Sequence, residues 1–441
     1  MIIYALVMAV LLLFAGIAVD AGLLYVTKAK LSAAVDSATL TGMKNLQSGQ
    51  TTAATLATGM FDANYGGNPP TPTVTFPTAS NGNLQVQVTA TAQVHTLFMR
   101  YLSQWRTVPV SDTAVATRGN LIMSIVLDRS GSMCGGTVTC PQGVTGDDGG
   151  EALQSAVPTF VGKFDNTVDE VALISFSENS TINFPIGYSF ITPITTAVAA
   201  MQFTGGTFGT GAGTGTLLSP TIGAPLSLAD AQNNSVTVTS GENVIKVVVY
   251  FTDGLMNTIQ DNFHCGGKTN NTLTLLNYGG FDTGSDVDIF DPTSATNVFD
   301  ADYAGGSGGF TYDTNGDICK DASGNIVTKF VSQQNGSETF SRTNVTAEAQ
   351  YRAIHTAIAM RTESPIPTYI YTIGLGNSVT TATQDFLAQL ANDPSYPSTY
   401  ILGQPAGEFF YVSNCPSSTC TTSLNTVFQT IASKVLLRLT Q

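Results

Sequence analysis

The sequence is poor in charged residues and in histidine, and these shortages exclude several kinds of function. Only 11% of its 441 residues are charged, and 31 acidic residues outnumber 17 basic ones. With a net charge of −14, no basic surface is available to replace the counterions of a nucleic acid, which excludes nucleic-acid binding. The three histidines, His95, His264 and His355, stand in no zinc-binding pattern.

Motifs of catalysis are also missing. The sequence contains no Walker loop and no His-Glu-x-x-His motif. His355 lies among alanine and isoleucine in a helical pattern, which favours a packed side chain over a catalytic one. We therefore expect a protein that is not an enzyme and has no catalytic residues. A hydrolase that uses a serine of the Asp128-Arg-Ser-Gly-Ser stretch is the disfavoured alternative, because no histidine is placed to pair with it.

The sequence begins with a long apolar stretch. Ile2–Val19 contains no charge, Asp20 follows, and Ala21–Val26 is again uncharged. A helix of about 20 apolar residues crosses a bilayer, so we expect a single-pass transmembrane helix over residues 1–26. A cleaved signal peptide is the alternative, but this run is too long and has no basic start. We expect Asp20 at the lipid headgroups, with a packing contact inside an assembly as the alternative.

Six cysteines indicate an oxidising compartment. Their even number, without a CxxC or Cys/His zinc spacing, favours disulfides over reduced buried thiols. Closeness in the sequence suggests the pairs Cys134–Cys140 and Cys415–Cys420, which leave Cys265–Cys319. The positive-inside rule gives the opposite compartment, because Lys28 and Lys30 follow the apolar run and no positive charge precedes it. We follow the cysteines and expect that a basic stretch is missing before Met1.

Residues 27–118 alternate between small-residue helix and strand patterns. Leu31–Gly42 continues the helix, and period-two alternation predicts strands over Thr73–Phe76, Leu84–Val94 and Val108–Thr117. Bulky apolar residues over His95–Trp105 predict a helix that closes the core of a small α+β domain, with a membrane-proximal protein interface as the alternative.

The N-terminal segments resemble the TadE/TadG-like proteins of tight-adherence (Tad, Flp) pilus assembly. The resemblance rests on the order of Ala15-Gly-Ile-Ala-Val-Asp-Ala-Gly22 and Leu24-Tyr25, followed by Leu31, Ala34, Asp36, Ala38, Leu40 and Gly42. Faces of small residues allow helices to approach closely in a membrane or a filament. The resemblance implies a bacterial protein of pilus assembly.

A buried strand followed by a loop of oxygen ligands organises the rest of the chain. Leu121–Leu127 is almost wholly apolar, and Asp128, Ser130 and Ser132 follow at alternate positions. Open α/β sheets bind ligands at the carboxyl ends of their strands. Carboxylate and hydroxyl oxygens suit Mg²⁺, Mn²⁺ or Ca²⁺. The alternative without a metal is a helix N-cap with a tight turn.

From Leu121 onward, strands alternate with helices. Apolar strands over Glu170–Phe176, Val244–Phe251 and Thr368–Ile373 are separated by helical patterns, which predicts an α/β fold with a doubly wound, mostly parallel sheet. The predicted strand Val244–Phe251 is followed directly by Thr252-Asp253-Gly254. Residues from about 258 to 343 predict a long irregular insertion.

These two motifs together resemble the von Willebrand factor A (vWA) domain and its metal-ion-dependent adhesion site. The resemblance implies that Ser130 and Ser132 bind the metal directly, and that Asp128 and Asp253 act through water or hydrogen bonds. It also implies a threonine from a third loop, for which Thr214 and Thr216 are the candidates and Thr207 the runner-up. Mg²⁺ is the expected divalent cation, with Mn²⁺ and Ca²⁺ as alternatives, and an acidic side chain of a protein partner would complete its coordination.

A second cation site is a weaker alternative. One stretch resembles part of a Ca²⁺ loop in the spacing of its oxygen-bearing side chains, but it has no glutamate at the twelfth position. Its candidate ligands are Asp313, Asn315, Asp317 and Asp321. An Asn-Gly hairpin turn explains much of the same pattern.

The sequence thus predicts three parts: a transmembrane helix over 1–26, a TadE/TadG-like helix and α+β region over 27–118, and a vWA (Rossmann-like) domain over 119–441 with its insertion. We expect a membrane-anchored protein with its bulk in the periplasm or at the cell surface, acting in pilus assembly or pilus-associated adhesion. A minor pilin or tip subunit, packed in the filament by its N-terminal helix, is the alternative.

Overall fold

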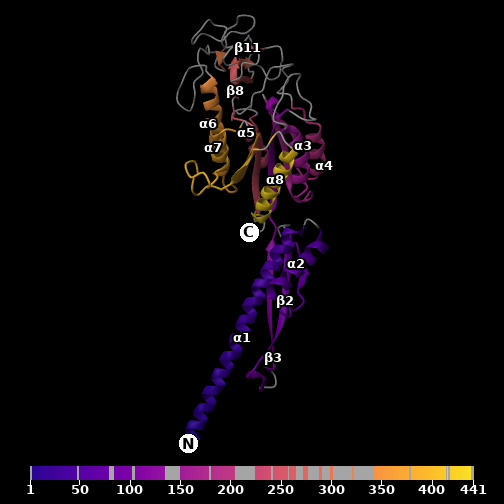
Figure 1. Ribbon diagram of the computed structural model, residues 1–441, viewed down its shortest axis with the longest axis vertical. Coiled ribbons are helices and arrows are strands. Elements are labelled where there is room, and N and C mark those ends of the chain that lie inside the picture. Colours follow the sequence, from indigo (N-terminus) through magenta and orange to yellow (C-terminus); the bar gives the residue numbers. More distant parts are fainter. Residues whose placement is uncertain are drawn as a thin grey trace. The chain divides into compact units, whose positions relative to one another are not determined.

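The computed structural model in Figure 1 divides into two compact units. The first comprises residues 1–120, 239–243 and 435–441, and the second comprises 121–238 and 244–434. The residues whose structure is described are 2–46, 49–78, 84–101, 105–134, 149–177, 180–203, 224–239, 242–256, 258–264, 272–276, 288–290, 298–300, 320–321, 342–376, 379–413, 415 and 418–438.

The first unit packs a long helix and a short one against a three-stranded sheet. Helix α1 (Ile2–Lys44) is continuous, and α2 (Gln50–Tyr65) packs against it. The antiparallel strands are β1 (Thr73–Thr75), β2 (Gln85–His95) and β3 (Thr107–Thr117), in that order. The apolar core contains Leu31 and Val35 of α1, Phe61 of α2 and Val88 of β2. Burying these side chains stabilises the C-terminal half of α1 on the sheet.

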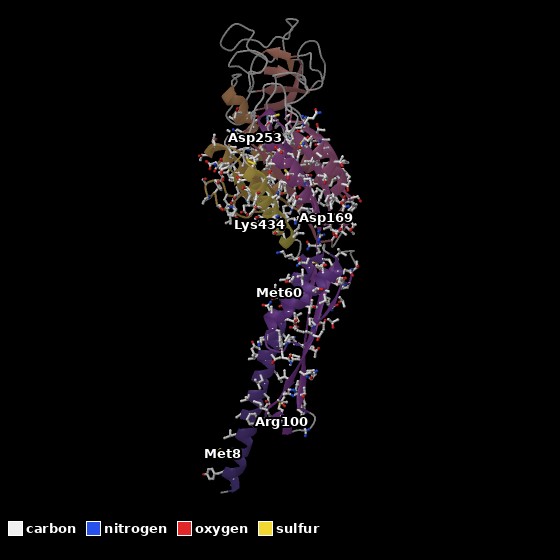
Figure 2. All side chains as sticks on the ribbon, turned by 45° about the vertical axis from the view of Figure 1, so that its right-hand side comes forward. Met8, Met60, Arg100, Asp169, Asp253 and Lys434 are labelled. Atoms are coloured by element: carbon white, nitrogen blue, oxygen red, sulfur yellow. A yellow bond between two sulfur atoms is a disulfide. The ribbon has the colours of Figure 1, made fainter. Side chains whose placement is uncertain are left out.

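The N-terminal half of α1 exposes apolar side chains. Tyr4, Met8, Leu11 and Phe14 are each more than half exposed, and Met8 projects from this half in Figure 2. Among the residues that the structure describes, no helix meets the length and hydropathy expected of a membrane span. The transmembrane helix over residues 1–26 therefore stays a prediction.

The predicted helix over His95–Trp105 is wrong. The described residues of this β2–β3 connection form only a 3₁₀ turn, Met99–Tyr101, and Leu97, Phe98 and Trp105 are about half exposed rather than in a core. The buried carboxylate of Asp20 accepts the backbone N–H groups of Leu97, Phe98 and Met99 and so caps this single turn. Those N–H groups are the ones that a helix starting here would leave without intrahelical partners.

The second unit is built on a six-stranded sheet. Its strands lie in the order β14 (Glu408–Val412), β13 (Thr368–Leu375), β7 (Val244–Thr252), β4 (Asn120–Asp128), β5 (Glu170–Phe176) and β6 (Ser180–Gly187). The pairs β4–β5, β7–β13 and β13–β14 are parallel, and the edge strand β6 is antiparallel to β5. The prediction of an α/β fold with a mostly parallel sheet is confirmed.

Helices cover both faces of this sheet (Figure 1). On one face lie α3 (Gly149–Val161), α4 (Ile191–Ala199) and α8 (Ser418–Arg438), where Phe160 of α3 contacts Phe428 of α8 with ring centroids 4.7 Å apart. On the other lie α5 (Pro225–Ser235), α6 (Arg342–Arg361) and α7 (Thr381–Ala391), which share a core with Val126 and Ile370 of the sheet. Strands covered on both faces explain the continuous apolar runs in the sequence.

The insertion after β7 contains regular structure. Its described residues include an antiparallel sheet in the order β11 (Val298–Asp300), β10 (Asp288–Phe290), β9 (Thr272–Leu276), β8 (Thr258–His264) and β12 (Lys320–Asp321). The expectation of an irregular segment over 258–343 is wrong for these residues. Their short strands, separated by long Gly- and Asn-rich stretches, lack the sustained alternation that would have predicted them.

Candidate functional site

The predicted oxygen ligands lie where the strand order of the large sheet reverses. From β4 the chain adds β5 and β6 on one side, and later adds β7, β13 and β14 on the other. Asp128 is the last residue of β4, and Asp253 follows the last residue of the neighbouring strand β7. The two carboxylates therefore occupy the switch point, the usual ligand-binding position of an open α/β sheet. Figure 2 labels Asp253 at this end of the second unit.

Asp128 is buried and organises the loop that follows it. Its Oδ1 accepts the backbone N–H of Ser130 at 2.8 Å, and its Oδ2 accepts the hydroxyl of Thr252 at 2.6 Å. Both carboxylate oxygens are thereby oriented by groups from two neighbouring strands. The backbone N–H of Arg129 donates to the carbonyl of Phe176 at 2.9 Å, which fixes the loop to β5 as well.

The two serine hydroxyls lie side by side. Ser130 Oγ and Ser132 Oγ are 3.0 Å apart, with Ser130 buried and Ser132 partly exposed. The 3₁₀ turn Gly131–Met133 gives this spacing, and the N–H of Met133 donates to the carbonyl of Ser130. A pair of neighbouring hydroxyl oxygens, one open to solvent, is an arrangement that can ligate a small cation and leave its outer side accessible.

Two glycines let helix α3 approach this loop. A Cβ on Gly149 would lie 2.4 Å from a methyl of Leu375 and 2.8 Å from the methyl of Met133. A Cβ on Gly150 would lie 2.8 Å from the ring of Phe203. Any larger residue at either position would push the start of α3 away from the loop. The Gly149-Gly150 pair thus has a packing function that sequence reasoning missed, although the doubled glycine before a helical pattern was a visible signal.

Burial perturbs the acidic groups at this site. Burial raises the pKa of the Asp128 carboxyl, and hydrogen bonds from Ser130 and Thr252 offset only part of that rise. Burial, with the negative charges of Asp128 and Asp253, raises the pKa of Tyr250 well above its ordinary value. Two buried carboxylates in one place, Asp128 and Asp253, concentrate negative charge that a divalent ion would stabilise.

The donor set fits a hard cation. Within the described part of the chain, no group of three or more His, Cys, Asp and Glu side chains converges as a metal site. The site instead combines serine hydroxyls with the carboxylates of Asp128 and Asp253, so all of its donors are oxygens. Oxygen donors suit Mg²⁺, Mn²⁺ and Ca²⁺ and are a poor match to Zn²⁺ or Cu⁺. These residues therefore fit the cation that the sequence predicts.

Several predicted residues lie outside the described residues. They are the threonines Thr207, Thr214 and Thr216, the proposed calcium ligands Asp313, Asn315 and Asp317, and the cysteines Cys140, Cys265 and Cys319. Asp321 ends strand β12, and the position of its side chain is likewise outside the description. The third-loop threonine, the Ca²⁺ loop and two of the three disulfide pairs stay predictions.

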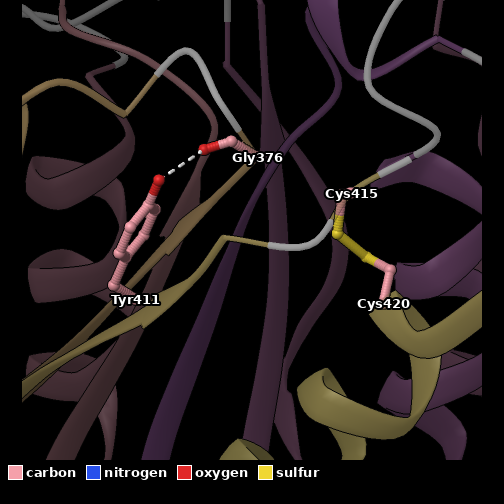
Figure 3. The surroundings of a disulfide bond; sticks show 4 residues. All are labelled: Gly376, Tyr411, Cys415 and Cys420. Carbon is pink, nitrogen blue, oxygen red and sulfur yellow. Dashed lines mark hydrogen bonds between the residues drawn. A yellow bond between two sulfur atoms is a disulfide. The ribbon is translucent and has the colours of Figure 1, made fainter. Parts of the chain in front are cut away.

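The predicted local disulfide between Cys415 and Cys420 is present. It joins the end of the segment after β14 to the first turn of α8, with the two Cα atoms 5.1 Å apart (Figure 3). Nearby, the hydroxyl of Tyr411 donates to the carbonyl of Gly376 at 3.2 Å and ties β14 to the residue after β13. Cys134 is buried beside the loop of Ser130 and Ser132, and its Sγ contacts the carbonyl oxygen of Phe203.

The structure also shows something that the sequence did not predict for two residues, Thr252 and His355. Sequence reasoning noted Thr252 but gave it no role, whereas the structure places its hydroxyl on Asp128. Its position as the last residue of β7 was the signal, because neighbouring parallel strands end at the same edge.

The expectation that His355 is packed is wrong in part: its side chain is exposed on α6, with its ring against that of Tyr351.

Family comparisons agree with both resemblances drawn from the sequence. Residues 1–45 match the family described as putative Flp pilus-assembly TadE/G-like, and residues 123–273 match the von Willebrand factor type A domain. The chain therefore combines a TadE/G-like N-terminus with a vWA domain. Among curated proteins, no sequence gives a significant match.

The solved structures that match this chain are distant in sequence and have low TM-scores. The PilB minor pilin from Streptococcus sanguinis is 14% identical with a TM-score of 0.39, over 85% of this chain and 81% of its own. The vWF domain of the type V pili tip protein Mfa5 from Porphyromonas gingivalis is 12% identical with a TM-score of 0.36, over 71% and 95%. Proximal thread matrix protein 1 from the mussel byssus is 14% identical with a TM-score of 0.34, over 72% of this chain and 46% of its own, so this chain spans less than half of that protein.

Proposed function

We propose that this protein acts in Tad/Flp pilus assembly or pilus-associated adhesion, anchored in the cell membrane by its N-terminal helix with its bulk outside the cytoplasm. In this proposal the vWA domain binds a protein partner through a metal-ion-dependent adhesion site. The TadE/G-like match over residues 1–45 supports the pilus setting, and the vWA match supports the adhesion site. No catalytic step is part of the proposal.

One observation carries the binding site. Asp128 is buried at the strand-order switch point, and both of its oxygens are held by Ser130 and Thr252. The serine hydroxyls that follow it are 3.0 Å apart. A carboxylate used to orient hydroxyls, rather than to neutralise the ion itself, would leave positive charge for a ligand from outside.

Each residue then has a distinct role. Ser130 and Ser132 would ligate a Mg²⁺ ion directly, while Asp128 and Asp253 would hold its water ligands or orient the hydroxyls. Thr252 positions Asp128, and Thr214 or Thr216 would add a ligand from the third loop. When bound, the cation supplies the charge that attracts a carboxylate of a partner, such as a pilus subunit or an assembly component. Mn²⁺ or Ca²⁺ could take the same oxygen donors.

A metal titration tests the site. Thermal unfolding of the full chain is followed while Mg²⁺ or Mn²⁺ is added to the wild type and to Asp128→Ala. At a roughly hundredfold excess over Kd, binding stabilises by about 2.7 kcal/mol, which raises the melting temperature of a domain of this size by about 5 °C. We expect this rise in the wild type and its loss in Asp128→Ala.

Two further variants make the result decisive. Ser132→Ala removes a partly exposed hydroxyl and should weaken the metal response without endangering the fold, whereas Asp128→Ala removes a buried group. Asp385→Ala removes an exposed carboxylate of α7 in the same unit and should respond to metal like the wild type. Equal metal-induced shifts in all four proteins would contradict the adhesion site. Hydrolytic activity that is lost in Ser130→Ala and indifferent to Mg²⁺ would favour an enzyme instead.

A minor pilin or tip subunit is the second candidate function. It is supported by the continuous α1 helix, whose N-terminal apolar side chains are exposed and would be covered by neighbouring helices in a filament. The two candidates differ in where the protein is found. Recovery in sheared, purified pili supports the filament subunit, and a detergent requirement for extraction, with no copies in sheared pili, supports the anchored form.

A further inference from the structure

The described part of the β2–β3 connection, residues 96–101 and 105–106 and here termed the hairpin tip, is hydrogen-bonded to helix α1. The carboxylate of Asp20 accepts the N–H groups of Leu97 at 2.7 Å, Phe98 at 3.0 Å and Met99 at 2.6 Å. The hydroxyl of Thr96 donates to the carbonyl of Trp105 at 2.7 Å and closes the base of the tip. Hydrogen bonds to an ionised carboxylate are strong, so the tip has a fixed position along the helix.

The position of the hairpin tip along α1 also depends on Gly16. The ring of Phe98 packs on Gly16, where a Cβ would lie 2.7 Å from the ring. Gly16 is about one helical turn before Asp20, at the end of the uncharged stretch Ile2–Val19. The hairpin tip therefore lies beside the last turn of that stretch.

The surface of the hairpin tip is apolar with a basic margin. Leu97 is 52% exposed, Phe98 50% and Trp105 43%, although the tip is packed against α1 on its other side. Arg100 and Arg106 flank these side chains and are exposed (Arg100 is labelled in Figure 2). Aromatic rings flanked by arginines, at the end of an apolar helix, match the composition of a membrane–water interface.

We propose that the hairpin tip is seated in the headgroup region of an anionic lipid bilayer, with Leu97, Phe98 and Trp105 at the acyl boundary and the arginines on the lipid phosphates. The inference rests on the membrane anchoring proposed above. It adds a second contact with the same bilayer, which Asp20 holds at a set depth relative to the helix. Such a contact would restrict the tilt of α1 and the orientation of the first unit at the membrane surface.

The single tryptophan of the chain makes this testable. Trp105 is the only source of indole fluorescence, so the full-length protein is reconstituted into phosphatidylcholine–phosphatidylglycerol vesicles with brominated lipid. Flotation of the vesicles reports anchoring separately. We expect a blue-shifted emission that is quenched about twofold by lipid brominated near the headgroup end of its acyl chains, and less by lipid brominated at the chain terminus.

A pair of glycine variants supplies the matched control. Gly16→Val would displace the ring of Phe98, whereas a Cβ on Gly22 of the same helix meets nothing within 4 Å. Gly16→Val should lose most of the quenching and still float with the vesicles, and Gly22→Val should behave like the wild type. Arg100→Glu should weaken the contact with anionic vesicles about fivefold, while Lys44→Glu at the far end of α1 should not.

Each other outcome overturns the proposal in a different way. Flotation with Trp105 unquenched by either lipid leaves anchoring intact and overturns the lipid contact of the tip. A blue shift without lipid quenching assigns the tip to a protein neighbour instead. Absence of flotation overturns the anchoring on which the inference rests, and with it the inference.

Discussion

Two buried aspartates, one in each unit of the molecule, use the same chemistry to different ends. Asp20 accepts three backbone N–H groups from the hairpin tip, so its charge is compensated by its own chain. Asp128 accepts hydroxyl groups as well as N–H groups, and burial still raises the pKa of its carboxyl. The first aspartate fastens two elements together, and the second orients neighbouring oxygens.

The difference lies in what surrounds each carboxylate. Around Asp20 the partners are N–H donors alone, which satisfy a charge and offer nothing to a ligand. Around Asp128 the partners include the hydroxyl of Thr252, with the hydroxyls of Ser130 and Ser132 close by. Hydroxyl groups can donate to a carboxylate and still present lone pairs elsewhere. A buried aspartate beside hydroxyls is therefore a better indicator of a cation site than one beside backbone N–H groups.

The largest expected effect comes from removing Asp20. Asp20→Ala leaves three N–H groups of the hairpin tip without their acceptor, and so releases the tip from α1. We expect hydrogen exchange at Leu97, Phe98 and Met99 to quicken on the order of a hundredfold, measured by mass spectrometry or NMR. Asp36→Ala, an exposed carboxylate on the same helix, is the control and should change nothing at the tip. Unchanged protection in Asp20→Ala would mean that Asp20 does not fasten the hairpin tip to α1.

A smaller effect is expected at the partner of Asp128. Thr252→Val keeps the shape of the side chain and deletes the hydroxyl that donates to Asp128 Oδ2. Leaving a buried acceptor without this donor costs about 1–3 kcal/mol of unfolding free energy, measured by urea denaturation. Metal affinity should fall as well, because Asp128 is less firmly oriented. Thr252→Ser retains the hydroxyl and should recover both properties; a Thr252→Val protein as stable as the wild type would show that Asp128 needs no positioning partner.

The smallest effect concerns a carboxylate that lies beside another acid. Burial, then its hydrogen bond to Glu363 and the charge of that residue, raise the pKa of Asp230 to about 7. Since the folded pKa exceeds the unfolded value near 4, the stability that Asp230 contributes is full below about pH 4 and lost as the pH rises to about 7. Asp230→Asn should thus stabilise the protein above pH 7, by about 1 kcal/mol after solvent screening, and lose this advantage at pH 4.

Urea denaturation at the two pH values measures this difference. Asp385→Asn, an exposed carboxylate in the same unit, should show no pH-dependent gain. A gain in Asp230→Asn that is the same at both pH values would mean that the neighbouring acid is not its cause.

The parts of the fold that the sequence predicted well are those set by local pattern. Strands β4, β5 and β7 are continuous apolar runs, because both faces of each are covered by helices, and their bounds agree with prediction within a residue or two. Helix α4 and strand β14 were missed. The first is short and contains Pro193 and several threonines, and the second is a five-residue edge strand paired with β13 alone. Neither has a pattern long enough to predict.

Contacts between distant residues account for the remaining differences. The hairpin tip was predicted as a core helix because its own residues are bulky, whereas Leu97, Phe98 and Trp105 are about half exposed and the turn is held by Asp20, 77 residues away from Leu97. At the site, strand ends were sufficient to place Asp128, Ser130, Ser132 and Asp253 near one another. The hydrogen bond from Thr252 to Asp128 joins residues 124 apart, and it depends on β4 and β7 being neighbours, which no local pattern reveals.

The insertion starts next to Asp253, and the loop of Asp128 is held by a different part of the chain. Strand β8 starts at Thr258, shortly after Asp253, and α6, which ends the insertion, packs against β8 and β9. The loop of Asp128 is held instead by β5, through the bond from Arg129 to Phe176. A change in the length of this insertion would therefore alter the surface that adjoins Asp253 and leave the bond that holds the loop of Asp128 in place.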